Sequence, residues 1–282
     1  MPITTFAALF RPKGSKFFSK TLIFNVLSAF YRTTIFMKIL VCISQTPDTT
    51  AKISFTADGT GFNSAGVQFI MNPYDEWYAL VRACELREAG GGTVVALNVG
   101  PAANETTIRK ALAIGADEAV RIDAEPKSAA FVAKQVAEYA KTEKFDLLLF
   151  GKETIDYNGS EVGAMVAEYL DLPYVSYASK LDLDGQTATV ERDIEGGVEV
   201  LEVDLPLALS AAKGMAEQRI PNMRGIMTAR TKPLKIVPPV DFTESVQAVR
   251  FTLPPEKAGV KLVDPENMAE LVRLLHEEAK VI

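Results

Sequence analysis

The fold of this chain is decided by the stretch LLLFGKETIDYNGSEVG, which runs from Leu147 to Gly163. An apolar strand enters a polar, glycine-bearing turn, and the turn leads directly into a helix. The first backbone N–H groups of a helix have no acceptor inside it, and the helix dipole adds positive potential there. Such a turn can hold a phosphate without Lys or Arg, with Gly159 allowing close approach and Ser160 capping the helix. An ordinary strand-to-helix turn is the alternative.

Aliphatic runs alternate with longer amphipathic segments on both sides of this stretch, which is typical of a parallel sheet covered by helices. We expect strands at Lys38–Ser44, Thr93–Val99, Glu118–Ile122, Leu147–Gly151 and Ala208–Ala211. We expect helices at Pro73–Ala89, Asn104–Ile114, Ser128–Thr142 and Ser160–Leu170. Asn72 is the predicted N-cap of the first helix, because Pro follows it at the first helical position. This order predicts an open α/β domain with a mainly parallel sheet and helices on both faces.

The C-terminal third of the chain departs from this alternation. Three segments with alternating polar and apolar residues, joined by glycine turns, predict an antiparallel meander on the sheet edge: Ser179–Asp184, Thr187–Asp193 and Val198–Val203. Beyond Thr231 the chain is extended and rich in proline, and it ends in a predicted helix at Pro265–Ala279. A tail of this kind has little core of its own, so we expect it to lie on its own domain or on a partner.

The first 36 residues differ in charge from the rest. They carry five basic and no acidic residues, whereas the remaining chain has 25 basic and 36 acidic residues, a net charge of −11. This acidic body is a poor match to nucleic acid. The apolar run at residues 21–31 is too short to span a bilayer, so no membrane insertion is expected. We interpret Met37 as the natural start and residues 1–36 as an extension outside the fold; a mitochondrial-type transit peptide is the alternative.

The sequence offers little for acid–base, nucleophilic or metal chemistry. Cys42 and Cys84 fall in a predicted strand and a predicted helix, which favours reduced, packed thiols over a disulfide or a metal site. His276 is the single histidine and lies near the C-terminus. A Ser/His/Asp or Cys/His arrangement cannot be assembled around it. We therefore expect neither a catalytic residue nor a metal ligand.

Ligands of an open α/β sheet bind beyond the carboxyl ends of its strands. Four segments are expected to meet there: residues 42–44, Asn72, residues 98–101 and residues 156–161. The main chain at Val99 and Gly100 suits a flat ring, and Asn72 suits a hydrogen bond to a purine edge. The chain has neither a GxGxxG after the first strand nor a Walker lysine loop. The sequence therefore predicts a mononucleotide site.

A basic, methionine-bearing segment follows the last core strand at residues 213–225. Methionine side chains adapt to apolar pockets of different shape, and basic side chains attract acidic partners or a cofactor phosphate. The segment therefore predicts a docking surface, with these apolar and basic members: Met215, Ile220, Met223, Lys213, Arg219 and Arg224. We also expect a short helix from Asn222 to Arg230 that turns Ile226 and Met227 inward and Met223 outward.

Several motifs, in this order, resemble the β subunit of electron transfer flavoprotein over residues 37–282. They are Met71-Asn-Pro73, Gly100-Pro101 followed by Glu105–Asp117, Gly151–Asp156 running into Val162-Gly163, Val190–Gly197, and Arg219 with Ile226–Arg230. The resemblance implies an adenine-nucleotide α-hydrolase-like fold. It places a nucleotide-binding domain at residues 37–231, with a recognition loop at 213–225. It also implies that the extended arm and terminal helix at 232–282 contact a partner subunit.

The same resemblance implies an electron carrier that forms a heterodimer with an α subunit. The two subunits share one FAD, and the β subunit binds AMP. Electrons pass from acyl-CoA dehydrogenases toward a quinone-reducing acceptor in fatty acid β-oxidation. Carried over by position, the nucleotide contacts are Cys42, Asn72, Val99, Asp156, Gly159, Ser160, Glu161 and Val162. The partner contacts are Met223 and Arg219 in the recognition loop, and Arg192 and Asp193 facing the FAD domain of the α subunit.

The turn after the fourth strand departs from the family pattern. AMP-binding members have Asn-Gln-Thr there, and electron-bifurcating members, which hold a second FAD in place of AMP, have Ala-Gln-Val. This chain has Ser160-Glu161-Val162, and Tyr157-Asn158 replaces the Gly-Asp of the bifurcating pattern, which favours AMP. A stand-alone adenine-nucleotide domain of the universal-stress type and a nucleotide-dependent ligase are the competing classes. The resemblance implies a bacterial cytoplasmic protein, or a mitochondrial matrix protein if residues 1–36 are a transit peptide.

Overall fold

The computed structural model describes residues 36–256 and 259–282. The contacts of the chain divide it into two compact units. The first contains the residues up to Lys52 together with Ala65–Gln247, and the second contains Ile53–Ser64 together with Ala248–Ile282. This division differs from the predicted boundary between residues 231 and 232. The predicted N-terminal extension lies outside the described residues, apart from Phe36.

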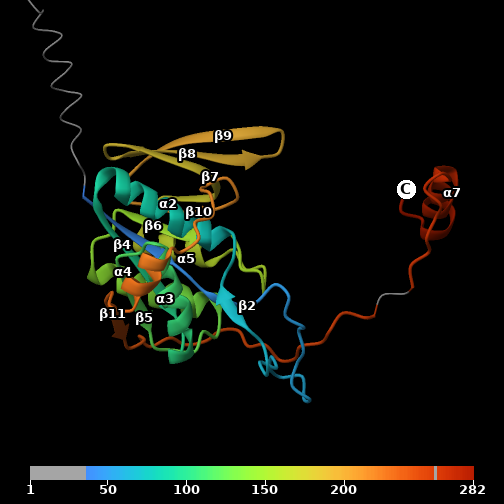
Figure 1. The fold of residues 1–282 in the computed structure, drawn as a ribbon, viewed down its shortest axis with the longest axis horizontal. Coiled ribbons are helices and arrows are strands. Elements are labelled where there is room, and N and C mark those ends of the chain that lie inside the picture. Colours follow the sequence, from blue (N-terminus) through green and yellow to red (C-terminus); the bar gives the residue numbers. More distant parts are fainter. Residues whose placement is uncertain (1–35, 257–258) are drawn as a thin grey trace, which may run out of the picture. The chain divides into compact units, whose positions relative to one another are not determined.

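A nine-stranded sheet forms the centre of the first unit, in the order β11-β5-β4-β1-β6-β10-β7-β8-β9 (Figure 1). Neighbouring strands from β11 to β7 run parallel, and β7, β8 and β9 are antiparallel. The predicted α/β fold with an antiparallel meander on its edge is confirmed. The strands are β1 (Met37–Cys42), β4 (Gly92–Val99), β5 (Glu118–Ile122), β6 (Leu147–Gly151), β7 (Tyr174–Asp184), β8 (Thr187–Ile194), β9 (Gly197–Asp204), β10 (Leu207–Ala211) and β11 (Leu234–Val237).

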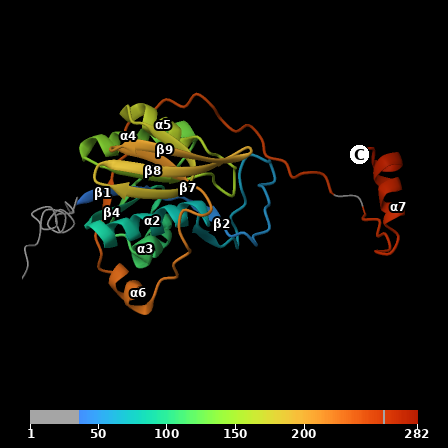
Figure 2. The same ribbon diagram turned by 90° about the horizontal axis from the view of Figure 1, so that it is seen from above.

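Four helices cover the two faces of the sheet, α2 and α3 on one side and α4 and α5 on the other (Figure 2). They are α2 (Asp75–Gly90), α3 (Glu105–Ile114), α4 (Ala129–Thr142) and α5 (Val162–Leu170). In β1, Ile39 and Val41 enter the core beneath α2 and α3, whereas Leu40 enters the core beneath α4 and α5. Successive side chains of a strand point to opposite faces, so a continuous apolar run is what a doubly covered strand requires.

The extended tail begins on its own domain. After the short helix α6 (Met223–Ala229), β11 adds a strand that the sequence pattern did not predict, from Leu234 beside Ala119 to Val237 beside Ile122. Gln135 of α4 then clamps Val240: its Nε2 donates to the Val240 carbonyl at 2.8 Å, and its Oε1 accepts from the Val240 N–H at 2.7 Å. The tail up to this point is therefore part of the α/β domain.

Two predicted helix starts are wrong. Helix α2 begins at Asp75, and its N-cap is Tyr74, which has a positive φ of 65° and no side-chain cap; Asn72 lies before it. Helix α5 begins at Val162 with Glu161 at the N-cap position, so Ser160 does not cap it. The side chain of Asn72 bonds to the loop after β6 and so is not available as a cap. The side chain of Ser160 faces solvent.

The second unit is small. Phe55 pairs with Phe62 across an isolated antiparallel bridge and stacks on Phe251, with the ring centroids 5.3 Å apart. The predicted terminal helix is present from α7 (Met268–Arg273) through a π-helical segment (Leu274–Ala279). Among the described residues, none of the helices combines the length and the apolar character that crossing a bilayer requires.

The start of β4 generates a first prediction. Gly92 has φ +114°, and a Cβ atom there would lie 2.0 Å from the carbonyl oxygen of Met37 on β1. Gly92→Ala should therefore lower the free energy of unfolding by more than about 3 kcal/mol, since backbone must move at the centre of the sheet. Gly185→Ala is the matched control: its φ is also positive, but a Cβ meets nothing within 4 Å, so it should cost only about 1–2 kcal/mol. Equal losses in urea denaturation would contradict this account.

Candidate functional site

The carboxyl ends of β1, β4 and β6 lie side by side, because β1 pairs with both of the other strands. Asn98 near the end of β4 donates from Nδ2 to the carbonyl of Ile43, at 2.9 Å, and accepts from the amide of Asn104 at 3.1 Å. Gly100 leaves the space for this pair, since a Cβ there would lie 2.1 Å from Nδ2 of Asn104. Buried polar groups need such partners, so these bonds fix the β1 and β4 ends together. Val99, a predicted nucleotide contact, is buried beside them.

Asn72 joins three segments of this edge. Its backbone N–H donates to the carbonyl of Ser44 at 3.1 Å. Its side-chain amide donates to the carbonyl of Glu153 at 3.0 Å and accepts from the N–H of Ile155 at 3.1 Å. The side chain is completely buried. Asn72 therefore holds the loop after β6 against the end of β1, and its contact with a purine stays a prediction.

Glu76 is a buried carboxyl group that the sequence analysis did not identify. It lies in the first turn of α2, where its Oε2 accepts from the Ser44 N–H at 2.6 Å and its Oε1 is bonded to the Ser44 hydroxyl at 2.7 Å. Burial raises the pKa of Glu76 to about 8, and the charge of Asp156 adds to the rise. The hydrogen bonds from Ser44 lower the pKa but do not offset burial. Gly151 makes room for it, because a Cβ there would lie 2.7 Å from the Glu76 Cγ. At neutral pH this carboxyl group is therefore mostly protonated.

A signal for Glu76 was present in the sequence. Glu76, Leu80 and Ala83 recur at helical spacing and all three are buried. An acidic residue inside the apolar stripe of an amphipathic helix indicates a buried carboxyl group that needs partners.

Cys42 ends β1 close to this carboxyl group. Desolvation raises the pKa of its thiol well above the usual value, and the charge of Glu76 raises it further. A protonated thiol is a poor nucleophile and a poor metal ligand. Cys42 thus contributes an uncharged, apolar surface to this edge of the sheet. In the described part of the chain, no group of His, Cys, Asp and Glu is arranged to hold a metal ion.

The turn between β6 and α5 is compact and faces solvent. The N–H of Thr154 donates to the carbonyl of Gly159 at 3.1 Å, and that of Asn158 donates back to the carbonyl of Thr154 at 2.9 Å. Asn158 has a positive φ of 51°, which Asn tolerates better than most residues. The side chains of Asp156, Ser160 and Glu161 are exposed.

The backbone of this turn fits an anion such as a phosphate. Within residues 36–256 and 259–282, no acceptor takes the N–H groups of Ser160 and Glu161. They precede the first helical residue, Val162, whose own N–H lies in the unsatisfied first turn. The space beside Gly159 is open, because a Cβ atom added there would lie 4.0 Å from its nearest neighbour in the protein. Open space, free donors and a helix start thus coincide in this turn.

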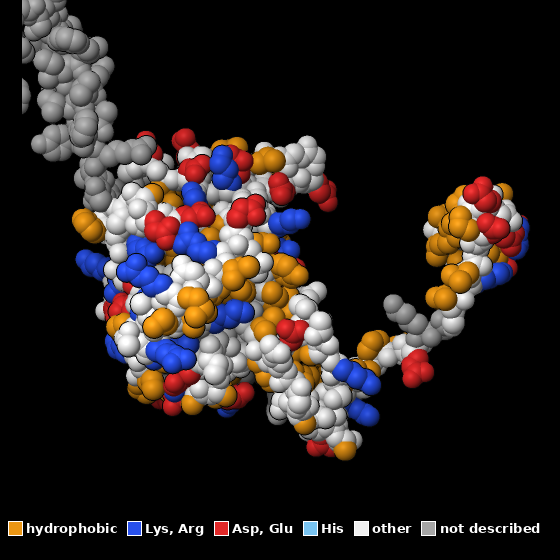
Figure 3. Space-filling model, in the orientation of Figure 1, with side chains coloured by type: hydrophobic (Ala, Val, Ile, Leu, Met, Phe, Trp, Pro, Cys, Tyr) orange, Lys and Arg blue, Asp and Glu red, His pale blue; other side chains and the backbone are white. Residues whose placement is uncertain are grey.

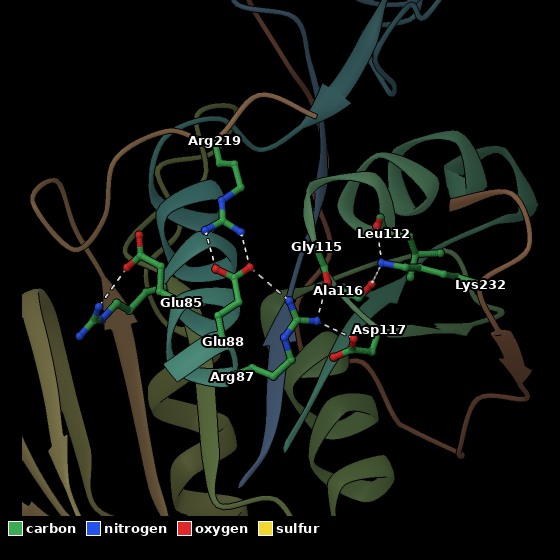
Figure 4. A network of polar contacts seen from close by, with 10 residues as sticks. Glu85, Arg87, Glu88, Leu112, Gly115, Ala116, Asp117, Arg219 and Lys232 are labelled. Atoms are coloured by element: carbon green, nitrogen blue, oxygen red, sulfur yellow. Dashed lines mark hydrogen bonds and ion pairs between the residues drawn. The ribbon is translucent and has the colours of Figure 1, made fainter. Parts of the chain in front are cut away.

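The recognition loop is fastened to the body by Arg219. Its guanidinium binds Glu88 of α2 with two bonds, at 2.7 and 3.0 Å (Figure 4). Its backbone carbonyl accepts from the indole N–H of Trp77 at 3.1 Å. The bonds from Arg219 lower the pKa of Glu88. Bidentate Arg–carboxylate pairs fix geometry as well as charge. Arg219 therefore positions the loop within its own chain, and a contact with a partner stays a prediction.

Helix α6 carries the exposed end of the loop. The side chain of Asn222 caps it by accepting from the N–H of Gly225 at 2.8 Å, and Met223 at its start is 74% exposed. The prediction that Ile226 and Met227 face inward is wrong, because they are 45% and 68% exposed. The buried residue of α6 is Ala229. Small residues contact the body here, so the large apolar side chains are left outside.

Met215 was predicted as part of the docking surface, and this is also wrong. Its side chain is buried in the core beneath α2 and α3. Lys232, beyond α6, is used internally as well: its ammonium binds the carbonyls of Leu112 and Ala116 at the end of α3 (Figure 4). Only part of the basic and methionine-bearing segment is therefore available to a partner.

Arg192 and Asp193 lie together on β8 of the meander. The guanidinium of Arg192 bonds to Glu199 of β9 at 2.5 Å and to the hydroxyl of Ser176 on β7 at 3.1 Å, so it ties three strands together. Asp193 is exposed. The contact of this pair with an α subunit stays a prediction.

Comparison with known proteins identifies one family. A family model described as the electron transfer flavoprotein domain matches residues 60–241. Electron transfer flavoprotein subunit beta of Bacillus subtilis (strain 168) is 38% identical over 261 residues, covering 87% of this chain and 100% of the relative. The mitochondrial subunit beta of Oryza sativa subsp. indica is 38% identical over 257 residues, covering 87% and 100%. The human subunit beta is 35% identical over 256 residues, covering 87% and 99%.

Glu76 generates a pH-dependent prediction. Its pKa rises from the ordinary 4.5 to about 8 on folding, so between these values the folded protein holds a proton that the unfolded chain has lost. The free energy of unfolding should therefore fall as the pH rises through this window, by at most about 1.4 kcal/mol per pH unit for this group. Glu76→Gln imitates the protonated form and removes this contribution. Relative to wild type, the variant should gain stability in urea denaturation between about pH 5 and about pH 8.

The matched control is Glu125→Gln, because Glu125 is exposed. It should keep the pH trend of the wild type. An identical trend in wild type and Glu76→Gln would show that Glu76 ionises in the folded protein as it does in the unfolded chain.

Proposed function

Because this chain belongs to the electron transfer flavoprotein family as a β subunit, we propose that it carries electrons as a heterodimer with an α subunit, with which it shares one FAD. The FAD supplies the redox chemistry when it is bound. The role of this chain is to bind, to orient and to dock. It contributes no acid–base or nucleophilic step of its own, because the FAD supplies the reaction.

The β subunit holds AMP at the end of β6. The observation that carries this assignment is the turn before α5, where the N–H groups of Ser160 and Glu161 have no acceptor among the described residues and Gly159 leaves open space. These donors receive the phosphate, and the dipole of α5 favours its charge. Cys42, Asn72, Val99 and Asp156 border the same edge and enclose the nucleoside. Glu161 is exposed, so its carboxylate can point to solvent and away from the phosphate.

The electrons come from acyl-CoA dehydrogenases and go to a quinone-reducing acceptor. Met223 supports the docking part of this proposal: it is the first residue of a capped helix, it is 74% exposed, and the loop before it is fastened through Arg219. An exposed apolar side chain on a fixed support is what a docking anchor requires, because little conformational entropy is lost on binding. Arg192 and Asp193 on the meander face the FAD domain of the α subunit.

The nucleotide content of the purified heterodimer tests the cofactor assignment. After denaturation, the released nucleotides should be one FAD and one AMP per heterodimer, measured by absorbance and chromatography. Two FAD and no AMP would overturn the AMP assignment and indicate an electron-bifurcating protein. Colourless protein without flavin, prepared together with its α subunit, would overturn the proposed function as a whole.

The docking assignment predicts a kinetic effect of Met223→Ala. The kcat/KM for reduction of the heterodimer by an acyl-CoA dehydrogenase should fall about tenfold, since a buried apolar anchor contributes roughly 1–2 kcal/mol to a complex. Flavin content should not change, because Met223 lies away from the sheet edge. Ile236→Ala on β11 is the control, as Ile236 is also exposed, at 55%. A rate equal to that of wild type would remove Met223 from the docking surface.

A further inference from the structure

A pocket of about 450 Å³ opens between α3 and α6. Its apolar walls come from both helices and from the loop before α6: Ala113, Ile220, Pro221, Ile226 and Ala229. Three cationic side chains complete the lining: Arg109 and Lys110 of α3, and Arg230 at the end of α6. Figure 2 shows α6 on the α3 side of the sheet, away from α4 and α5.

The walls of this pocket are held in place. A Cβ atom at Gly225 would lie 2.4 Å from the carbonyl oxygen of Ala113, so only glycine lets α6 approach α3 this closely. Arg109 donates from Nη1 to the carbonyls of Ala229 at 2.8 Å and Lys232 at 2.7 Å, which ties the end of α6 to α3. The pocket is therefore formed by fixed elements and does not depend on a partner to shape it.

The charge around the pocket is complementary to an acidic partner. About half of the Lys and Arg side chains in the described part of the chain have a carboxylate within 4 Å, and Arg109, Lys110 and Arg230 are among those that have none. Lys110 instead lies 4.6 Å from the ring centroid of Trp77. Basic side chains appear among hydrophobic ones on this face of the molecule (Figure 3). Charges arranged in this way attract an acidic surface and speed its association.

The apolar surface extends beyond the pocket. Ile220, Met223 and Met227 are 82%, 74% and 68% exposed. A small ligand inside the pocket would leave these side chains in water, whereas a protein laid across α6 would cover them. Contiguous exposed apolar side chains with a charged rim are typical of protein docking surfaces. The pocket and its surroundings therefore favour a protein as the occupant.

We propose that the pocket between α3 and α6 receives an apolar side chain from an acidic partner protein, the same partner that covers Met223. Docking then combines a projecting side chain of this chain with a receiving pocket beside it. The inference rests on the proposed function, and it adds a second contact with its own residues. Arg109 shapes the pocket, and Lys110 and Arg230 attract the acidic surface around the entering side chain.

Blocking the pocket tests this directly. Thr106 is exposed on α3 and lines the pocket, so Thr106→Trp fills the pocket from outside without disturbing the core. Thr142→Trp is the matched control, at the exposed end of α4 on the other face of the sheet. The probe is an acyl-CoA dehydrogenase that reduces the holo heterodimer. The KM for the heterodimer should rise about tenfold in Thr106→Trp and stay at the wild-type value in Thr142→Trp, with kcat and FAD content unchanged in both.

The charges are tested in the same assay. In the double variant Lys110→Gln/Arg230→Gln, the dependence of kcat/KM on ionic strength should become weaker than in wild type. Lys127→Gln, which removes an exposed cation elsewhere, should leave it unchanged. A wild-type KM in Thr106→Trp, or an unchanged salt dependence in the double variant, would overturn the pocket proposal alone. If the dehydrogenase does not reduce the wild-type heterodimer, the proposed electron donor and this inference both fail.

Discussion

The carboxyl edge of the sheet depends on one buried carboxyl group. Glu76 enters from the first turn of α2 and bonds to both the N–H and the hydroxyl of Ser44 just beyond β1. Asn72, four residues earlier, bonds to the loop that follows β6. A buried polar group without a hydrogen-bond partner costs free energy, so these contacts favour a single arrangement of the strand ends. Cys42 and the turn from Asp156 to Val162 adjoin the segments that these contacts fix, and Val99 ends β4, which Asn98 joins to Ile43.

This arrangement places two uncharged groups, those of Cys42 and Glu76, next to the polar turn after β6. The Cys42 thiol and the Glu76 carboxyl group are held protonated by desolvation, so they add little negative charge next to an expected phosphate. In the turn after β6, the N–H of Thr154 donates to the carbonyl of Gly159, and the N–H groups of Ser160 and Glu161 have no acceptor in the part of the chain that the structure describes. In the proposed site, the phosphate would be held by backbone dipoles, which need no reorganisation when it binds.

In the proposed docking surface around α6, hydrogen bonds and ion pairs within the chain leave apolar side chains exposed. Arg219 is paired with Glu88, and Lys232 and Arg109 bind carbonyl groups of α3 and of the segment around α6. Each bond holds the recognition segment close to α2 or α3. Because Gly225 and Ala229 form the inner side of α6, Met223 and Met227 face solvent. Exposed apolar side chains are unfavourable in water for an isolated subunit. On a rigid support they favour binding to a partner, because little conformational entropy is lost.

The sequence by itself determined the parallel α/β core, the edge meander and the position of the turn at residues 151–163. Apolar runs of strand length, helical periodicity and glycine turns are local signals, and they placed each core strand to within two residues. It did not determine β11, the inward role of Asn72, the buried carboxyl of Glu76 or the outward side of α6. These depend on segments far apart in the chain, as when Gln135 clamps Val240 or Ala113 leaves room only for Gly225. Periodicity indicates the buried side chains of the core strands and helices, but only tertiary packing decides which face of a short helix such as α6 is buried and which distant groups satisfy the polar ones.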